Sequence, residues 1–142
     1  MSGITDLSEL LANLQPVLSP TSYIFCFTEN TNLDAIASMS PLATFHEEEG
    51  MTFILNHESA VQHNIEINNV YRCITLKVHS SLEAVGLTAA VSSVLAKRGI
   101  SANVMAAFHH DHIFVHEDHA EQAMLALTEL SESVKRQQGE SI

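Results

Sequence analysis

Basic residues are scarce in this sequence of 142 residues. Six lysines and arginines stand against 17 aspartates and glutamates, which gives a formal net charge of −11. A surface of this charge repels phosphate backbones and anionic lipid headgroups, so we expect neither nucleic acid nor membrane among the partners. Hydrophobic residues make up 46% of the chain, enough for a packed core, which argues against wholesale disorder.

Long apolar stretches and paired cysteines are also missing. No run approaches the roughly 20 apolar residues that span a bilayer, and residues 1–14 lack the basic start and unbroken apolar stretch of a signal peptide. The expected location is therefore the cytoplasm. Cys26 and Cys73 each lie in an apolar, strand-like segment, and neither belongs to a C-x-x-C pair. We predict that both are buried, reduced thiols.

Catalytic signatures are absent as well. The sequence contains no G-x-S-x-G elbow, no P-loop and no dinucleotide fingerprint. His79 precedes Ser80 and Ser81, which could suggest a base beside a nucleophile. Side chains that are adjacent in sequence at the end of a strand, however, point in opposite directions, and no motif places an orienting acid beside them. The three glutamates at 47–49 are typical of a solvated turn. We therefore predict a protein without catalytic activity and without a cofactor.

The second half of the sequence has the clearest pattern of secondary structure. Residues 72–79 alternate between apolar and polar positions, which predicts a strand with one buried face. Ser80 and Glu83 match a helix-capping box and Gly99 is typical of a helix end, so we predict a helix over 82–98. The following segments predict a strand, a hairpin tip, a strand and a helix, over 100–109, 109–112, 113–115 and from Asp118 onward.

The first half resembles a shortened copy of the second. Phe45-His46-Glu47-Glu48 before a strand over 51–55 matches Phe108-His109-His110-Asp111 before the strand over 113–115. Two further segments match in the same order, which indicates a duplication. The first copy then differs, because Ser-Met-Ser-Pro at 38–41 limits its helix to about one turn.

The duplication divides the chain into three parts: a degenerate first copy over 1–68, a second copy over 69–135 and a loose tail over 136–142. Residues 6–14 form an apolar helical stripe behind an Asp6/Glu9 capping box. We predict that this helix packs on the sheet of the first copy. Residues 65–68 suit a final strand for the first copy. Nothing after Val134 suits one for the second, so we predict strand exchange between the copies or a missing edge strand.

Several segments resemble the ACT domain family. More narrowly, they are similar to a subgroup of uncharacterised bacterial tandem-ACT proteins and to the cytosolic arginine sensors of animals. The resemblance covers 23–130 and implies an α+β, ferredoxin-like βαββαβ fold in tandem, with antiparallel sheets and helices on one face. The segments that carry it are Ser80-Ser81-Leu82-Glu83-Ala84-Val85-Gly86-Leu87, Arg98-Gly99-Ile100-Ser101, residues 108–115, Leu42-Ala43-Thr44-Phe45 and residues 47–52.

Members of this family bind amino acids or other small effectors where the loop after the first strand meets a neighbouring unit. The resemblance therefore implies an amino-acid-binding regulatory module, and a homodimer because this chain holds only two copies. A helix start at this loop favours a carboxylate, and Asp111 matches an acid that faces the ligand in the arginine sensors. Gly86 would allow close approach of ligand or backbone. The predicted ligand-binding residues are Ser80, Ser81, Leu82, Glu83, Gly86 and Asp111.

Two alternatives stay open. The protein could use its ACT pair only to dimerise, since Ser80-Ser81-Leu82 replaces the Asp-x-Pro-Gly loop of many amino-acid-binding ACT domains. It could also bind Zn²⁺ or Ni²⁺ through a histidine cluster. No Cys and no helical H-x-x-x-H pair accompanies that cluster, so we favour solvated hairpin residues and predict no metal site. The cluster comprises His109, His110, Asp111, His112, His116 and His119.

Overall fold

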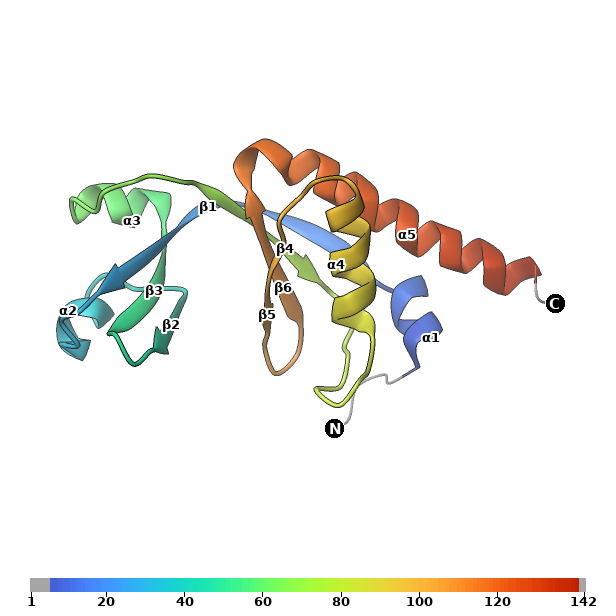
Figure 1. The fold of residues 1–142 in the computed structure, drawn as a ribbon, viewed down its shortest axis with the longest axis horizontal. Coiled ribbons are helices and arrows are strands. Elements are labelled where there is room, and N and C mark those ends of the chain that lie inside the picture. Colours follow the sequence, from blue (N-terminus) through green and yellow to red (C-terminus); the bar gives the residue numbers. More distant parts are fainter. Residues whose placement is uncertain (1–5, 141–142) are drawn as a thin grey trace. The chain divides into compact units, whose positions relative to one another are not determined.

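The computed structural model describes residues 6–140, which form helices and antiparallel strands of the α+β class (Figure 1). Contacts along the backbone divide the chain into two compact units. The split unit joins the segment up to Ser19 to the segment from Cys73 onward, and the continuous unit runs from Pro20 to Arg72. The α+β class that the sequence predicts is confirmed.

Six strands are joined in the order β2-β3-β1-β4-β6-β5. β1 (Pro16–Thr28) and β4 (Tyr71–Leu76) both contribute residues to each unit, because the boundaries between the units fall within them. Within the split unit, the amide of Lys77 donates to the carbonyl oxygen of Gln15 at 3.1 Å. The N-terminal segment therefore supplies the strand that the second copy lacks. Of the two alternatives predicted, strand exchange and a missing edge strand, the structure shows strand exchange.

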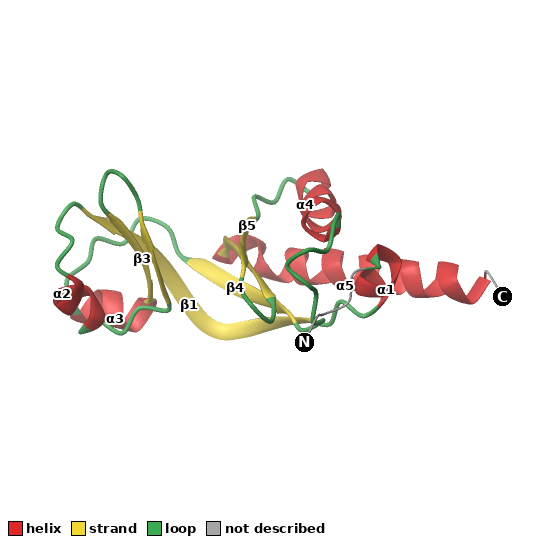
Figure 2. Ribbon diagram, turned by 90° about the horizontal axis from the view of Figure 1, so that it is seen from below, coloured by secondary structure: helices red, strands yellow, loops and turns green. Residues whose placement is uncertain are grey.

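The continuous unit packs two short helices on one face of its strands (Figure 2). Its elements beside β1 are α2 (Leu33–Ala37), β2 (Ala43–His46), β3 (Met51–Asn56) and α3 (His57–Gln62). β3 pairs antiparallel with both β1 and β2. The strand predicted over 51–55 and the one-turn helix before 38–41 are confirmed. The core side chains come from alternate strand positions and from both helices: Ile24, Cys26, Ile36, Met51, Phe53, Leu55 and Ala60.

The final strand predicted for the first copy is wrong. Residues 65–70 have no strand pairing, and β4 begins only at Tyr71. The neighbours of β1 in the sheet are β3 and β4, so no free edge of β1 remains for residues 65–68. Ile65 and Ile67 instead pack against the core as irregular backbone, which explains their apolar alternation without a strand.

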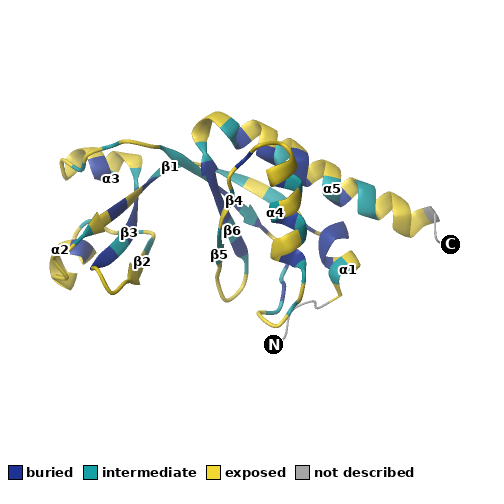
Figure 3. Ribbon diagram, viewed as in Figure 1, coloured by how far each residue is buried: buried dark blue, intermediate teal, exposed yellow. Residues whose placement is uncertain are grey.

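The split unit encloses a second hydrophobic core, in which helices cover strands β4 and β6 (Figure 3). Its other elements are α1 (Leu7–Ala12), α4 (Leu87–Lys97), β5 (Asn103–Ala106), β6 (Asp111–His116), a 3-10 turn η1 (Glu117–His119) and α5 (Ala120–Glu140). The three α-helices contact one another. Fully buried core side chains come from all three α-helices and from β4 and β6: Leu10, Ile74, Leu95, Ile113, Val115 and Leu127.

The N-terminal helix does not pack where the sequence predicts. Its cap is confirmed, because the Asp6 carboxylate accepts a hydrogen bond from the Glu9 amide at 2.9 Å. Its leucines, however, belong to the core of the split unit, and Ser131 on α5 donates to the Ala12 carbonyl oxygen at 3.1 Å. The prediction that α1 covers the first copy is wrong: an apolar stripe requires a buried partner but does not specify which one.

The predicted loose tail is wrong for most of its length. Helix α5 runs on to Glu140, and residues 141–142 lie outside the described residues. Leu130 and Val134 pack against the core of the split unit, and the polar residues that follow are good helix formers, so nothing ends the helix at 135.

Both cysteines are buried free thiols, as predicted. Burial raises the pKa of Cys26 and of Cys73 above the ordinary thiol value, which leaves them poorly reactive. Within residues 6–140, no helix is both long and apolar enough to cross a membrane.

Candidate functional site

A small cavity of about 70 Å³ lies in the split unit, where the loop after β4 meets the start of α4 and the turn between β5 and β6. Four of the six predicted site residues, Ser80, Ser81, Leu82 and Asp111, line it. The structure therefore brings residues from two distant segments to one place. The remaining lining residues are Ala84, Leu87, Thr88 and Ala106.

Asp111 is the charged group of this pocket. It is the first residue of β6, pairs with Ala106 of β5, and is only 8% exposed. Burial raises the pKa of the Asp111 carboxyl, and the charges of His112 and His110 and a hydrogen bond from Ser80 only partly offset this. An ionised carboxylate that has lost its water in this way is stabilised by a cation placed beside it.

The start of α4 differs from the sequence prediction. The helix begins at Leu87 and not at 82, and the capping box between Ser80 and Glu83 is wrong: the Glu83 amide donates to the Ser81 hydroxyl at 3.1 Å instead. Gly86 is the N-cap residue, in a left-handed conformation with φ 98°. The loop thus turns once more before the helix begins.

Because α4 begins at Leu87, its N-terminal end lies at the cavity. Leu87 and Thr88, the first two helical residues, both line it, and the N-cap Gly86 has no side chain to accept from their amides. The first amides of a helix lack partners within the helix and carry a partial positive charge. The cavity therefore combines an electropositive helix end with the buried carboxyl of Asp111.

Glu83 and Gly86 do not line the cavity, although the sequence places them in the site. Glu83 is exposed in the loop. A Cβ on Gly86 would lie 3.1 Å from Cδ2 of Leu7, so this glycine turns the chain and makes room for α1. Four lining residues are not among those predicted: Ala84, Leu87, Thr88 and Ala106. Only the true start of α4 places Leu87 and Thr88 at the cavity, whereas the pairing of Ala106 with Asp111 follows from hairpin register.

The matching helix start of the continuous unit is capped by a side chain of its own loop. The Asn32 side chain caps α2 and accepts hydrogen bonds from the amides of Asp34 and Ala35 at 3.0 and 3.3 Å. β3 and β6 share one burial pattern, which places Met51 at the position of Asp111, whereas the motif match in the sequence pairs Asp111 with Glu48. An apolar side chain and a capped helix thus replace the two charged features found in the split unit.

The histidine cluster separates into groups at the two ends of β6. His79, His109 and His110 lie near its start, with ring centroids 5.5 Å apart for His79–His109 and 6.2 Å for His109–His110. His116 and His119 lie at its other end, 6.1 Å apart. Across residues 6–140, no three His, Cys, Asp or Glu side chains are placed so that they could hold a metal ion.

The loops around the cavity carry exposed apolar side chains. Leu82, which lines the cavity, is 65% exposed, and Val85 in the same loop is 82% exposed. Phe108, in the turn between β5 and β6, is 69% exposed and packs edge-on against His109. Apolar groups of this size in two adjoining loops are typical of a surface that contacts a ligand or another protein.

The fold and the tandem repeat define an ACT-domain protein. Models of the ACT domain match residues 2–72 and residues 64–129, and the chain belongs to the ACT domain family. The prediction of a tandem ACT-domain protein is therefore confirmed. No curated protein shows significant sequence similarity to the chain.

Three solved structures illustrate how close the relatives are. A Vibrio cholerae protein of unknown function, described as a possible transport protein, is 48% identical, with a TM-score of 0.78 over 84% of this chain and 92% of its own. An Agrobacterium tumefaciens protein is 17% identical, with a TM-score of 0.63 over 78% and 83% of the two chains. The regulatory subunit of aspartate kinase from Thermus flavus is 10% identical, with a TM-score of 0.57 over 81% and 95%. The last two share the fold.

Proposed function

We propose that this protein is a non-catalytic regulatory module that binds a small amino-acid effector at the cavity around Asp111. One observation carries the proposal: the buried carboxyl of Asp111 and the uncapped start of α4 line the same cavity. An α-amino acid carries an ammonium and a carboxylate on neighbouring atoms. The ammonium suits Asp111 and the carboxylate suits the helix amides at Leu87 and Thr88.

The size of the cavity limits how the ligand is held. About 70 Å³ accommodates roughly two water molecules at ~30 Å³ each, so only the polar end of an amino acid fits inside. Its side chain would extend past Leu82 towards solvent. We infer that a second copy of the chain covers this mouth in a homodimer, because the exposed Leu82, Val85 and Phe108 offer an apolar contact surface there.

The resemblance of the sequence motif to that of the arginine sensors suggests a finer form of the proposal. In those proteins the residue that matches Asp111 faces the ligand, and a desolvated carboxylate also suits a guanidinium, which can donate two parallel hydrogen bonds. The fold likeness to an aspartate kinase regulatory subunit supports a regulatory role. A cytoplasmic location would fit an effector drawn from the metabolic pool.

The asymmetry between the two units supports one ligand for each chain. The continuous unit has Met51 where the split unit has Asp111, and its helix α2 is capped by Asn32. Neither charged feature of the proposed site is therefore repeated. A binding stoichiometry of one effector per chain follows, or two per homodimer.

The main alternative is a module that only dimerises. The small volume of the cavity favours it, as does the replacement of the Asp-x-Pro-Gly loop by Ser80-Ser81-Leu82. Under this alternative, the exposed apolar loops would form a permanent contact with a second copy and no effector would enter.

A thermal-shift screen of the twenty amino acids distinguishes the two. A ligand at a hundredfold excess over its Kd stabilises the fold by about 2.7 kcal/mol, which is readily measured. We expect one or a few amino acids to raise Tm, and Asp111→Asn to remove the effect. Asp118→Asn is the matched control, since it makes the same chemical change on an exposed residue of η1. A screen without any response would favour the dimerisation module.

A further inference from the structure

A second cavity lies in the continuous unit, and the duplication explains why it exists. In the split unit the helix after the first strand, α4, has 11 residues, whereas its counterpart α2 has five. Ser40, with a left-handed φ of 54°, and Pro41 turn the chain away after α2. A hollow of about 340 Å³ remains between this turn and α3, within the size range of small-molecule sites.

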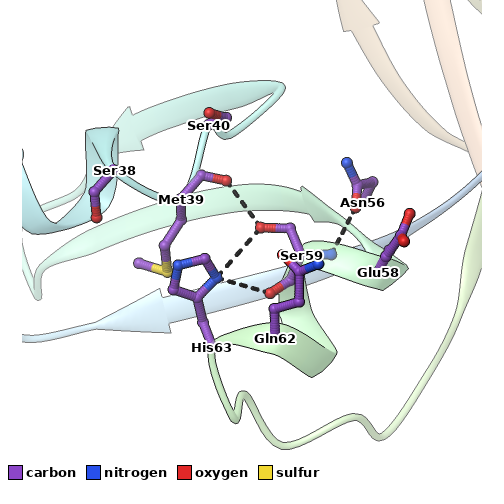
Figure 4. A pocket seen from close by; sticks show the side chains of 8 residues that line it. All are labelled: Ser38, Met39, Ser40, Asn56, Glu58, Ser59, Gln62 and His63. Atoms are coloured by element: carbon purple, nitrogen blue, oxygen red, sulfur yellow. Dashed lines mark hydrogen bonds between the residues drawn. The ribbon is translucent and has the colours of Figure 1, made fainter.

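Hydrogen bonds hold the two sides of this hollow together (Figure 4). The Ser59 hydroxyl on α3 donates to the carbonyl oxygen of Met39 at 2.9 Å, across 20 positions of sequence. The Asn56 side chain caps α3 by accepting from the Ser59 amide at 2.7 Å. Figure 4 shows the residues at 38–40 on one side and Asn56 and Glu58 on the other. The hollow is therefore a formed feature of the unit.

Several hydrogen-bond donors of the lining are already used within the unit, among them the Ser59 hydroxyl and the Ser38 hydroxyl, which donates to the carbonyl oxygen of Ala35 at 2.6 Å. Nδ1 of His63 lies 2.9 Å from the carbonyl oxygen of Ser59. A carbonyl oxygen can only accept, so Nδ1 carries a hydrogen and donates it to this carbonyl. The Glu58 carboxylate and the Gln62 amide oxygen are acceptors in the lining. A ligand that donates hydrogen bonds suits this set.

The net charge of the continuous unit also favours a positively charged ligand. Between Pro20 and Arg72, seven carboxylate side chains accompany a single basic one, Arg72 itself. Glu58 is the acid that lines the hollow, and within the described residues no ion pair involves it. A cation in the hollow would be attracted by Glu58 directly and by the remaining acids at longer range.

We propose that the hollow lined by Met39, Ser40, Glu58, Gln62 and His63 is a binding site for a small primary amine that carries a second hydrogen-bonding group. The ammonium pairs with Glu58, and the second group bonds to the side chain of Gln62, which lies one turn further along α3 on the same face. This site lies wholly within the continuous unit. It is separate from the cavity at Asp111 and does not depend on the function proposed for it.

Ethanolamine is a suitable probe, because it joins one ammonium to one hydroxyl. In a titration of the ¹⁵N-labelled full chain followed by NMR, we expect saturable shifts at the amides of 38–40 and 56–63, with a Kd of roughly 1 mM. Ethylene glycol has the hydroxyls but no charge, and it should bind at least about tenfold more weakly. Equal binding of the two probes would overturn the assignment of a cation site, and so would an absence of saturable shifts.

Two variants test the residues, each on an exposed helical position. Glu58→Gln removes the attraction and should weaken ethanolamine binding about tenfold or more. Gln62→Lys places a positive charge in the hollow, which repels the ammonium of ethanolamine and should abolish binding. Gln122→Lys on α5 is the matched control, because it makes the same charge change in the split unit. Unchanged binding in Glu58→Gln, or equal losses in both lysine variants, would contradict the proposal.

Discussion

Replacing Leu10 by alanine tests where the N-terminal helix packs. The Leu10 side chain is fully buried in the core that α1 shares with β4, α4 and α5. Removing a buried leucine loses the transfer free energy of its methyl groups and leaves a cavity, at a combined cost of about 2–5 kcal/mol. Domains of this size have a total stability of about 5–15 kcal/mol, so the loss should be large.

Urea unfolding followed by circular dichroism gives the total loss, and hydrogen exchange shows where it falls. We expect amides of α4, α5 and β6 to lose protection together, because they line the same core as Leu10. Leu125→Ala on α5 is the matched control, since that side chain is 54% exposed and should cost no more than about 0.5 kcal/mol.

The outcome that refutes this reasoning is specific. If Leu10→Ala costs less than about 1 kcal/mol, α1 does not contribute a core side chain to the split unit. If it lowers protection in β2 and β3 while α4 and α5 keep theirs, the helix packs on the first copy, as the sequence pattern predicts.

Two further predictions concern the site and its loop. Because burial raises the folded-state pKa of Asp111, its contribution to stability is complete below the unfolded pKa and is lost as the pH rises through the folded one. Asp111→Asn without ligand should therefore be more stable than the wild type at pH 7 and lose this advantage in acid; urea unfolding over that range checks it, and an advantage independent of pH would contradict it. Gly86→Ala should cost roughly 2 kcal/mol, from a left-handed backbone and a contact with Leu7, whereas Gly99→Ala meets no atom within 4 Å and should cost about 1 kcal/mol. Equal losses of Tm in the two variants would show that the contact with Leu7 is unimportant.

The Asp111 prediction connects stability to function. A carboxyl that is desolvated in the free protein weakens the fold at neutral pH, and a bound ammonium would remove that cost. If the proposed function holds, the same substitution should stabilise the free protein and abolish the response to the effector. A residue with a purely structural role would not be expected to show both effects.

The sequence by itself determined the elements whose signals are local. The capping of α1 by Asp6, strand β3 and the one-turn helix α2 each depend on side chains within a few positions of one another. The family motif also predicts that Ser80 and Asp111 lie close together, and both line the same cavity. These predictions succeed because periodicity and capping act over single turns and strands.

Tertiary structure decided what those elements contact. The leucine stripe of α1 requires burial but suits either core, and only the packing against Ile74 and Ser131 assigns it to the split unit. At the site, two local signals compete for the start of α4, and the left-handed turn at Gly86 prevails over the capping box at Ser80. Strand exchange likewise joins segments about 60 residues apart, because the free energy of burial depends on contact in space and not on distance along the chain.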